Sequence, residues 1–299
     1  MRKQYKVSNW SEYNKSLVNR GRIDLWLDFD LLAKETVEYS GFGRPKQYGE
    51  YLITVLSCIR SMFNLPLRFL QGFAKTLLKL ESVPDYTTIC KRLKDIKVEL
   101  PKMRAGSVLA IDSTGLKVLG DGEWLRYKHG QQRRRKWEKL TIALDIATGE
   151  IVAHHTMAGN SHDVNAIDSI VTTLRSSNAK AARIVADGAY DNRRSYDCLA
   201  SIGNKILIPP RTGAKLWAGY EDRKQAIEYI ASKGRYLWAK HSGYSLRNHV
   251  EAAIARIKKI FSPALRSRTE HNKKAEITSK IAILNTFTSL GRAQSCLVT

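Results

Sequence analysis

The sequence lacks a long hydrophobic run, because no apolar stretch of its 299 residues approaches the ~18 that a membrane-spanning helix requires. Its first residues also lack the apolar core of a secretory signal, so we expect a cytoplasmic protein without a membrane partner. The four cysteines are scattered, with no CxxC and no histidine spacing typical of zinc, which favours a reducing compartment. A hydrophobic fraction of 43% excludes general disorder.

Acidic residues are also scarce: 28 Asp and Glu stand against 50 Lys and Arg, giving a net charge of +22 and a pI near 9.9. An excess of this size indicates a polyanionic partner, and nucleic acid is the usual one. A membrane surface is the rival, but binding there needs an insertion device that the sequence does not show. We therefore expect a nucleic-acid partner.

Residues 1–100 predict a helical region. Three segments with apolar residues at helical spacing follow one another from 48 to about 97, and Asp85 stands where it can cap the third. Short links between helices, the last of which is basic, are typical of a helix-turn-helix DNA reader. Lys91 and Arg92 of that last helix would bind DNA by holding phosphates. The alternative is a plain helical bundle with a solvated outer face.

Residues 101–299 predict an α/β region. An apolar strand and a hairpin come first, and helices then alternate with strands, which argues for a mixed sheet with helices on its faces. The expected strands and hairpin lie at 107–118, 140–159, 182–190 and 205–210.

Three further segments have weaker patterns. Residues 23–40 suggest one strand turning into another, residues 211–243 a small insertion with a short helix, and residues 293–299 a frayed tail.

Two acids, Asp112 and Asp187, each end or interrupt an apolar strand. A charged side chain is costly inside a sheet, so such an acid needs a metal, a partner or solvent. Functional sites in open sheets collect at the carboxyl ends of strands. The alternative interpretation is that these are cap and turn acids that never meet.

A third acid, Glu251, lies on an amphipathic segment, 244–261. At helical period, Tyr244, Arg247, Glu251 and Lys258 fall within a sector of roughly 60° beside an aliphatic stripe. Alone, this pattern also fits a solvated face on which Glu251 pairs with Arg247. Gathered with the two aspartates, however, Glu251 would complete an oxygen site suited to Mg²⁺ or Mn²⁺. Two such ions about 4 Å apart can activate water or a 3′-hydroxyl for phosphodiester displacement.

A basic run spans residues 126–140, between the first expected strand and the hairpin. Its candidate phosphate contacts are Arg133, Arg134 and Arg135. A charge run of this kind is also often a plain solvated face.

The segments AIDSTGLKV and VADGAYD, together with the spacing Tyr-x₂-Arg-x₃-Glu-x₆-Lys, resemble the DDE transposases of bacterial insertion sequences. The likeness is to the insertion sequence 5 family, especially its insertion sequence 903 branch, and covers most of the chain. LPLRFLQGF, VPDYTTICKRL, GEWLRYKHG and ILIPPR add to it.

The resemblance implies a ribonuclease H-like catalytic domain that cleaves DNA at element ends with Mg²⁺, and joins the freed 3′-hydroxyl to target DNA. Asp112, Asp187 and Glu251 would be catalytic metal ligands, while Tyr244, Arg247 and Lys258 would position or neutralise DNA. The partners would be terminal inverted repeats and target DNA, bound by a homodimer or higher oligomer. An inactive DNA-binding regulator of the same element and a site-specific nuclease without strand transfer are the alternatives.

Overall fold

The structure, a computed structural model, describes residues 4–25, 28–34, 47–78, 82–96, 98–119 and 137–298. The chain divides into two compact units: unit 1 combines Met1–Val98 with Arg266–Thr299, and unit 2 is Glu99–Leu265. Residues 266–299 therefore pack with the N-terminal helices, although the sequence pattern placed them in the second region. The functional extent of each domain stays a prediction.

Unit 1 is built around a helical core. The three helices expected between 48 and 97 are present, and Asp85 caps the third by accepting a 2.8 Å hydrogen bond from the Thr87 amide. Leucine, isoleucine and valine side chains from all three pack into one cluster, to which the last long helix adds Ala275. These helices are α3 (Glu50–Phe63), α4 (Leu67–Leu77), α5 (Tyr86–Arg92), which a short 3₁₀ turn, η2 (Leu93–Asp95), follows, and α12 (Glu270–Ser289).

Two expectations about the ends of unit 1 are wrong. Residues expected to form strands are helical where the structure describes them, in η1 (Ile23–Leu25) and α2 (Phe29–Lys34), after α1 (Trp10–Asn19). The expected frayed tail forms strand β8 (Ser295–Val298), which pairs antiparallel with β1 (Gln4–Val7). The tail has no local signal for this pairing, because its partner lies at the other end of the sequence.

A buried group of charges joins α3 to α12 within unit 1, and we call Arg60, Glu276 and Lys280 the ionic centre. Their side chains are only 7%, 4% and 3% exposed. The Glu276 carboxylate lies 2.9 Å from Lys280 Nζ and 3.8 Å from Arg60 Nη1, and it also accepts hydrogen bonds from the backbone amides of Arg266 and Ser267. The one acid therefore has four donors or cations around it.

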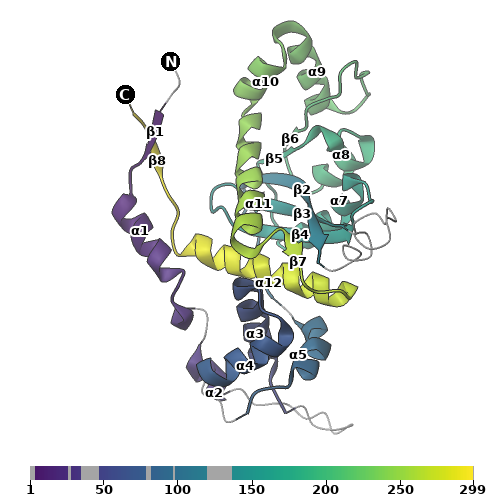
Figure 1. The fold of residues 1–299 in the computed structure, drawn as a ribbon. Coiled ribbons are helices and arrows are strands. Elements are labelled where there is room, and N and C mark those ends of the chain that lie inside the picture. Colours follow the sequence, from purple (N-terminus) through teal and green to yellow (C-terminus); the bar gives the residue numbers. More distant parts are fainter. Residues whose placement is uncertain are drawn as a thin grey trace, which may run out of the picture. The chain divides into compact units, whose positions relative to one another are not determined.

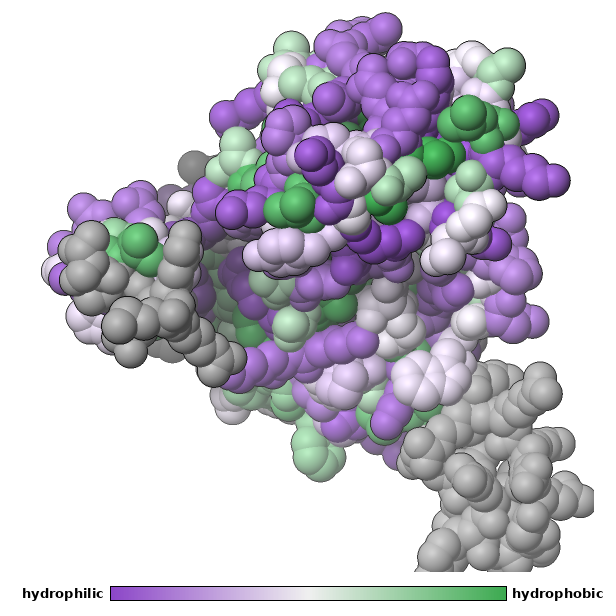
Figure 2. Space-filling model, turned by 90° about the horizontal axis from the view of Figure 1, so that it is seen from above, coloured by the Kyte–Doolittle hydropathy of each residue, from purple (hydrophilic) through white to green (hydrophobic). Residues whose placement is uncertain are grey.

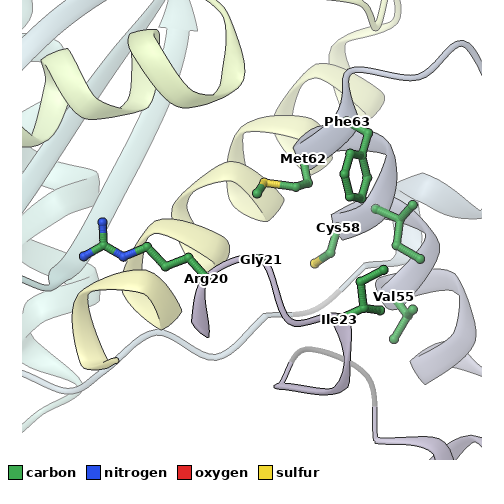
Figure 3. A pocket seen from close by; sticks show the side chains of 8 residues that line it. Arg20, Gly21, Ile23, Val55, Cys58, Met62 and Phe63 are labelled. Carbon is green, nitrogen blue, oxygen red and sulfur yellow. The ribbon is translucent and has the colours of Figure 1, made fainter. Parts of the chain in front are cut away.

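A small apolar pocket of about 90 Å³ also lies in unit 1, between α3 and the turn after α1 (Figure 3). Burial raises the pKa of Cys58, which lines it, to about 12, so this thiol stays protonated near neutral pH. The Arg20 guanidinium donates a hydrogen bond to the Gly291 carbonyl. The pocket thus presents neither an ionised thiol nor an uncommitted guanidinium.

No single described helix is long and apolar enough to cross a membrane, although α3 and α4, bent by 112°, pass that test as a pair.

Unit 2 contains the expected mixed sheet, in the order β4-β3-β2-β5-β6. β2 pairs antiparallel with β3 and parallel with β5, and the β3–β4 hairpin turns at Gly149, whose φ of +72° favours glycine. The strands are β2 (Val108–Val118), β3 (Trp137–Asp145), β4 (Ile151–Ala158), β5 (Arg183–Ala186) and β6 (Ile206–Leu207). A short strand, β7 (Ala264–Leu265), also pairs with the end of β2.

Helices cover both faces of this sheet (Figure 1). Apolar side chains of α7 (Ile167–Arg175) and α8 (Arg193–Ala200) share a buried cluster with Leu109 and Ile111 of β2. Helix α11 (Asn248–Phe261) packs against β2 and β3. Since side chains alternate along a strand, Asp112 belongs to the face opposite Ile111.

The expected insertion forms two helices, α9 (Glu221–Lys233) and α10 (Arg235–Ser242), of which the sequence pattern indicated only the first. A short 3₁₀ helix, η5 (Tyr244–Arg247), connects α10 to α11. The expected continuous helix over 244–261 is therefore split, and the sector calculated at α-helical period applies only from residue 248 onward.

Candidate active site

Strand register places Asp112 and Asp187 beside each other. The parallel ladder between β2 and β5 runs as far as the pair Ile111–Ala186; Asp112 is the next residue of β2, and Asp187 is the first residue after the end of β5. Neighbouring strands lie about 4.8 Å apart. As the expected strand at 107–118 implies, β2 continues past Asp112 to Val118, so this acid lies in the middle of a strand at the point where its parallel partner ends.

Arg247 connects Asp112 to Glu251. Its Nη1 lies 3.3 Å from Asp112 Oδ2, and its Nη2 lies 2.5 Å from Glu251 Oε1. The Asp112, Arg247 and Glu251 side chains are 17%, 20% and 47% exposed, so the group opens to solvent on the Glu251 side. We call Asp112, Asp187, Glu251 and Arg247 the acidic centre.

The pKa values of Asp112 and Arg247 are shifted by burial and by their neighbours. Burial is the largest effect on Asp112 and raises its pKa; the Ser113 amide and Arg247 oppose this, while Asp187 and Glu251 add to it. Burial lowers the pKa of Arg247, but Tyr244 and the three acids outweigh it, so the pKa is raised overall. The raised pKa of Asp112 reflects an acid that is half-buried near two other acids, with one guanidinium beside it.

The residue types of this centre fit a hard divalent cation, because carboxylate oxygens are the ligands that Mg²⁺ and Mn²⁺ prefer. Their present arrangement does not amount to a metal site: among the described residues, no three His, Cys, Asp or Glu side chains are placed to hold one ion. The guanidinium of Arg247 instead provides the positive charge that two of the carboxylates share.

The remaining predicted site residues are spread over both units. The Tyr244 ring packs against the Trp238 ring at a tilt of 35°, with ring centroids 5.2 Å apart, and burial raises the pKa of Tyr244 to about 12. Lys258 is half-buried on α11, two turns beyond Glu251. In unit 1, Lys91 is exposed on α5, whereas Arg92 donates a hydrogen bond to the Tyr48 carbonyl. The predicted phosphate contacts Arg133, Arg134 and Arg135 lie outside the described residues.

Sequence reasoning missed two polar contacts made by residues close to the two aspartates in the chain. Ser113 and Tyr190 share a 2.7 Å hydrogen bond between their hydroxyl groups. One residue farther on, Asp191 forms a buried ion pair with Arg223, 2.7 Å long. A polar residue directly after Asp112 and a Tyr-Asp pair shortly after Asp187 were the available signals, but neither spacing indicates a partner.

The surface is consistent with the net charge of +22. On the face shown in Figure 2, hydrophilic residues predominate and hydrophobic ones are scattered in small groups. A surface of this kind suits a polar, charged ligand better than an apolar one.

Two matches to known protein families cover the mixed sheet and much of unit 1. Residues 104–286 match the family described as Transposase DDE domain, and residues 18–121 match a second family of the same description. The first match covers more than half of the chain and includes Asp112, Asp187 and Glu251. The chain therefore belongs to the DDE transposase domain family.

Solved transposase structures share a distant likeness. The Drosophila P element transposase strand transfer complex is 13% identical, with 90% of this chain and 70% of that chain covered and a TM-score of 0.31. The Mos1 mariner paired end complex with Mn is 12% identical, with 76% and 82% covered and a TM-score of 0.25. At such low scores, the family matches carry the assignment.

Proposed function

We propose that this chain is a DNA transposase of a bacterial insertion sequence, of the insertion sequence 5 family and its 903 branch. It binds the inverted repeats at the element ends, cleaves the DNA there and joins the 3′-hydroxyl ends to target DNA. Membership of the DDE family supports the reaction class. The observation that carries the proposal is the register of β2 and β5, which brings two acids distant in sequence to adjoining positions, with Arg247 linking the first to Glu251.

The fold proposed for unit 2 is ribonuclease H-like. Its five main strands lie in the order β4-β3-β2-β5-β6 across the sheet. β3 pairs antiparallel with both β2 and β4, and β5 and β6 run parallel to β2. This order supports the proposal because β2 is the central strand of the sheet. The Asp112 side chain on β2 and the Asp187 residue that follows β5 therefore lie side by side.

The proposed metal ligands are Asp112, Asp187 and Glu251, with Mg²⁺ or Mn²⁺ as the ion and two ions per site. A bound divalent ion would supply activation of water or a 3′-hydroxyl and charge for the leaving oxygen. Asp112 lies within β2 and Asp187 follows the last residue of β5, whereas Glu251 is the most exposed of Asp112, Arg247 and Glu251. Arg247 pairs with Asp112 Oδ2 and Glu251 Oε1. These two oxygens could bind a metal ion only after the Arg247 side chain moves away.

DNA is the proposed partner, and at least two copies of the chain would act on the two ends together. In unit 2, Tyr244, Arg247 and Lys258 lie on η5 and α11, the elements that also carry Glu251. Guanidinium and ammonium groups there would neutralise phosphates near the acids. In unit 1, we propose α3, α4 and α5 as a helix-turn-helix-like reader, in which exposed Lys91 contacts phosphate and Arg92 fixes the helix by bonding Tyr48.

The test is a cleavage assay on a supercoiled plasmid carrying the DNA that flanks the gene, with Mg²⁺ or Mn²⁺ supplied. The wild-type protein should nick the element ends and yield joined products. Glu251→Gln should lose nicking while still binding end DNA, and binding by both should fall steeply as salt rises. Glu228→Gln, at an exposed position of α9, is the matched control and should cleave normally.

The products distinguish this function from its two alternatives. Nicked ends without joined products would indicate a site-specific nuclease. End binding without any nicking by the wild type would indicate a regulator without catalysis. Full cleavage by Glu251→Gln would contradict the role of Glu251.

A further inference from the structure

Three hydroxyl groups, one from a half-buried residue and two from buried ones, form a chain beneath the acidic centre. Ser113 Oγ lies 2.7 Å from Thr141 Oγ1 and 2.7 Å from Tyr190 Oη. Tyr190 and Thr141 are fully buried. Ser113 and Thr141 are directly opposite each other in the β2–β3 ladder, so this part of the chain is fixed by strand pairing.

The third hydroxyl comes from a segment that strand pairing does not hold. After Ala186 the β2–β5 ladder ends, and the chain enters a short 3₁₀ turn, η4 (Gly188–Tyr190), directly after Asp187. The hydrogen bond from Tyr190 to Ser113 therefore ties the turn that follows Asp187 to the residue that follows Asp112. It continues the connection between the two strands where their backbone hydrogen bonds stop.

The hydroxyl chain lies on the other face of the sheet from the Asp112 carboxylate. Side chains alternate along β2, so Ser113 points to the side on which Ile111 packs, and Tyr190 belongs to that same buried cluster beside α7 and α8. These hydroxyl groups are therefore placed to position the acids, and not to contact a metal ion or DNA themselves.

We propose that Ser113 and Tyr190 are positioning residues whose shared hydrogen bond sets the separation of Asp112 and Asp187 for joint binding of a divalent cation. The inference rests on the proposed function. A ligand on β2 and a ligand in the turn after β5 must both stay within about half an ångström of the geometry that an ion requires, and Mg²⁺ is especially strict. Without the hydroxyl bond, the turn carrying Asp187 gains freedom relative to β2, so ion binding must first restrict it.

The experiment measures Mn²⁺ binding to the full-length protein by titration calorimetry and by the electron paramagnetic resonance of bound Mn²⁺. Tyr190→Phe and Ser113→Ala should each weaken binding about tenfold, comparable to the loss when a metal ligand's hydrogen-bonded support is removed. The double variant should bind about as weakly as either single one, because both remove the same hydrogen bond.

Tyr196→Phe is the matched control. Tyr196 is also a buried tyrosine of unit 2, 3% exposed, but its hydroxyl has no hydrogen-bond partner among the described residues. Its removal should leave Mn²⁺ affinity and the resonance spectrum unchanged.

Several outcomes would overturn the inference. If the wild type binds Mn²⁺ and Tyr190→Phe and Ser113→Ala bind it equally well, the positioning role is wrong and the proposed function is untouched. The same holds if these variants only lower the melting temperature without changing affinity. If the wild type fails to bind Mn²⁺ while Asp112, Asp187 and Glu251 are intact, the proposed metal site is wrong and this inference fails with it. Should Tyr190→Phe fail to fold, Ser113→Ala decides.

Discussion

The ionic centre of unit 1 and the acidic centre of unit 2 contain the same kinds of side chain in opposite proportions. In the ionic centre, one carboxylate lies between two cations and accepts hydrogen bonds from two backbone amides. In the second, three carboxyl groups surround one guanidinium. Burial alone would raise the pKa of both Glu276 and Asp112. The cations around Glu276 outweigh it and lower the pKa, whereas at Asp112 the pKa stays raised.

Among the residues that the structure describes, positive charge thus exceeds negative charge in the ionic centre, whereas negative charge exceeds positive charge in the acidic centre. A buried acid with sufficient donors gains little from another cation, whereas an acid with a raised pKa among other acids would gain from one. The acidic centre is thus the one of the two that has a use for an added divalent ion.

The largest expected effect comes from breaking the ionic centre. Glu276→Gln leaves Arg60 and Lys280 buried without an anion, so we expect the free energy of unfolding of unit 1 to fall by about 3 kcal/mol. Chemical denaturation followed by a probe in unit 1 measures this. Glu251→Gln, the corresponding change in the more exposed pair, should cost less than about 1 kcal/mol. Equal losses in the two variants would remove the distinction between the centres.

The next effect is the acid sensitivity of unit 1. The pKa of Glu276 is below its ordinary value of 4.5, so the stability that its ionised form contributes is present in full above that pH. It is lost as the pH falls from 4.5 through the lower pKa of the folded state. Denaturation midpoints measured between pH 7 and pH 3 should fall more steeply in the wild type than in Glu276→Gln. Parallel pH profiles would contradict the assignment.

Removing the cation of the acidic centre should strengthen the binding of a metal ion there. Arg247→Gln removes the cation that competes for Asp112 and Glu251, so Mn²⁺ should bind about tenfold more tightly in the absence of DNA, which corresponds to about 1.4 kcal/mol. Titration calorimetry measures it. Arg175→Gln removes the same charge from α7, where it bonds Ser201, and is the control. Weaker binding by Arg247→Gln would show that the guanidinium supports the site.

The smallest effect concerns Asp112 itself. Because the pKa of Asp112 is raised above 3.8 in the folded state, its stabilising contribution is present below that pH and is lost as the pH rises through the folded value. At pH 7 the ionised carboxylate is therefore unfavourable. Asp112→Asn should raise the free energy of unfolding by about 0.5–1 kcal/mol while losing Mn²⁺ binding. A clear loss of stability would show that the pair with Arg247 outweighs burial.

Local pattern was sufficient to predict most of unit 2. Apolar strands and amphipathic helices have short periods, so the elements around Asp112, Asp187 and Glu251 could be located from the sequence. The direct link from Arg247 to Asp112 could not, because it depends on how η5 and α11 cross the sheet. Nor could the bond between Ser113 and Tyr190, since no spacing relates two hydroxyl groups on separate strands.

Unit 1 was harder to predict for the same physical reason. Its three central helices have clear periodicity, but the partner of α3 that supplies Glu276 comes from the far end of the sequence. The β1–β8 pairing is likewise non-local. Contacts between residues far apart in the sequence cannot be predicted from the spacing of nearby residues.

In the sequence, unit 2 interrupts unit 1, and this order has a consequence for synthesis of the protein. The chain begins unit 1, makes the whole of unit 2, and only then supplies the segment that carries Glu276 and Lys280. A ribosome that stops before α12 would release a chain that holds all three DDE acids yet leaves Arg60 facing no counter-charge. Premature termination would therefore yield a product whose unit 1 lacks the anionic partner of a buried cation, although no residue of its acidic centre is missing.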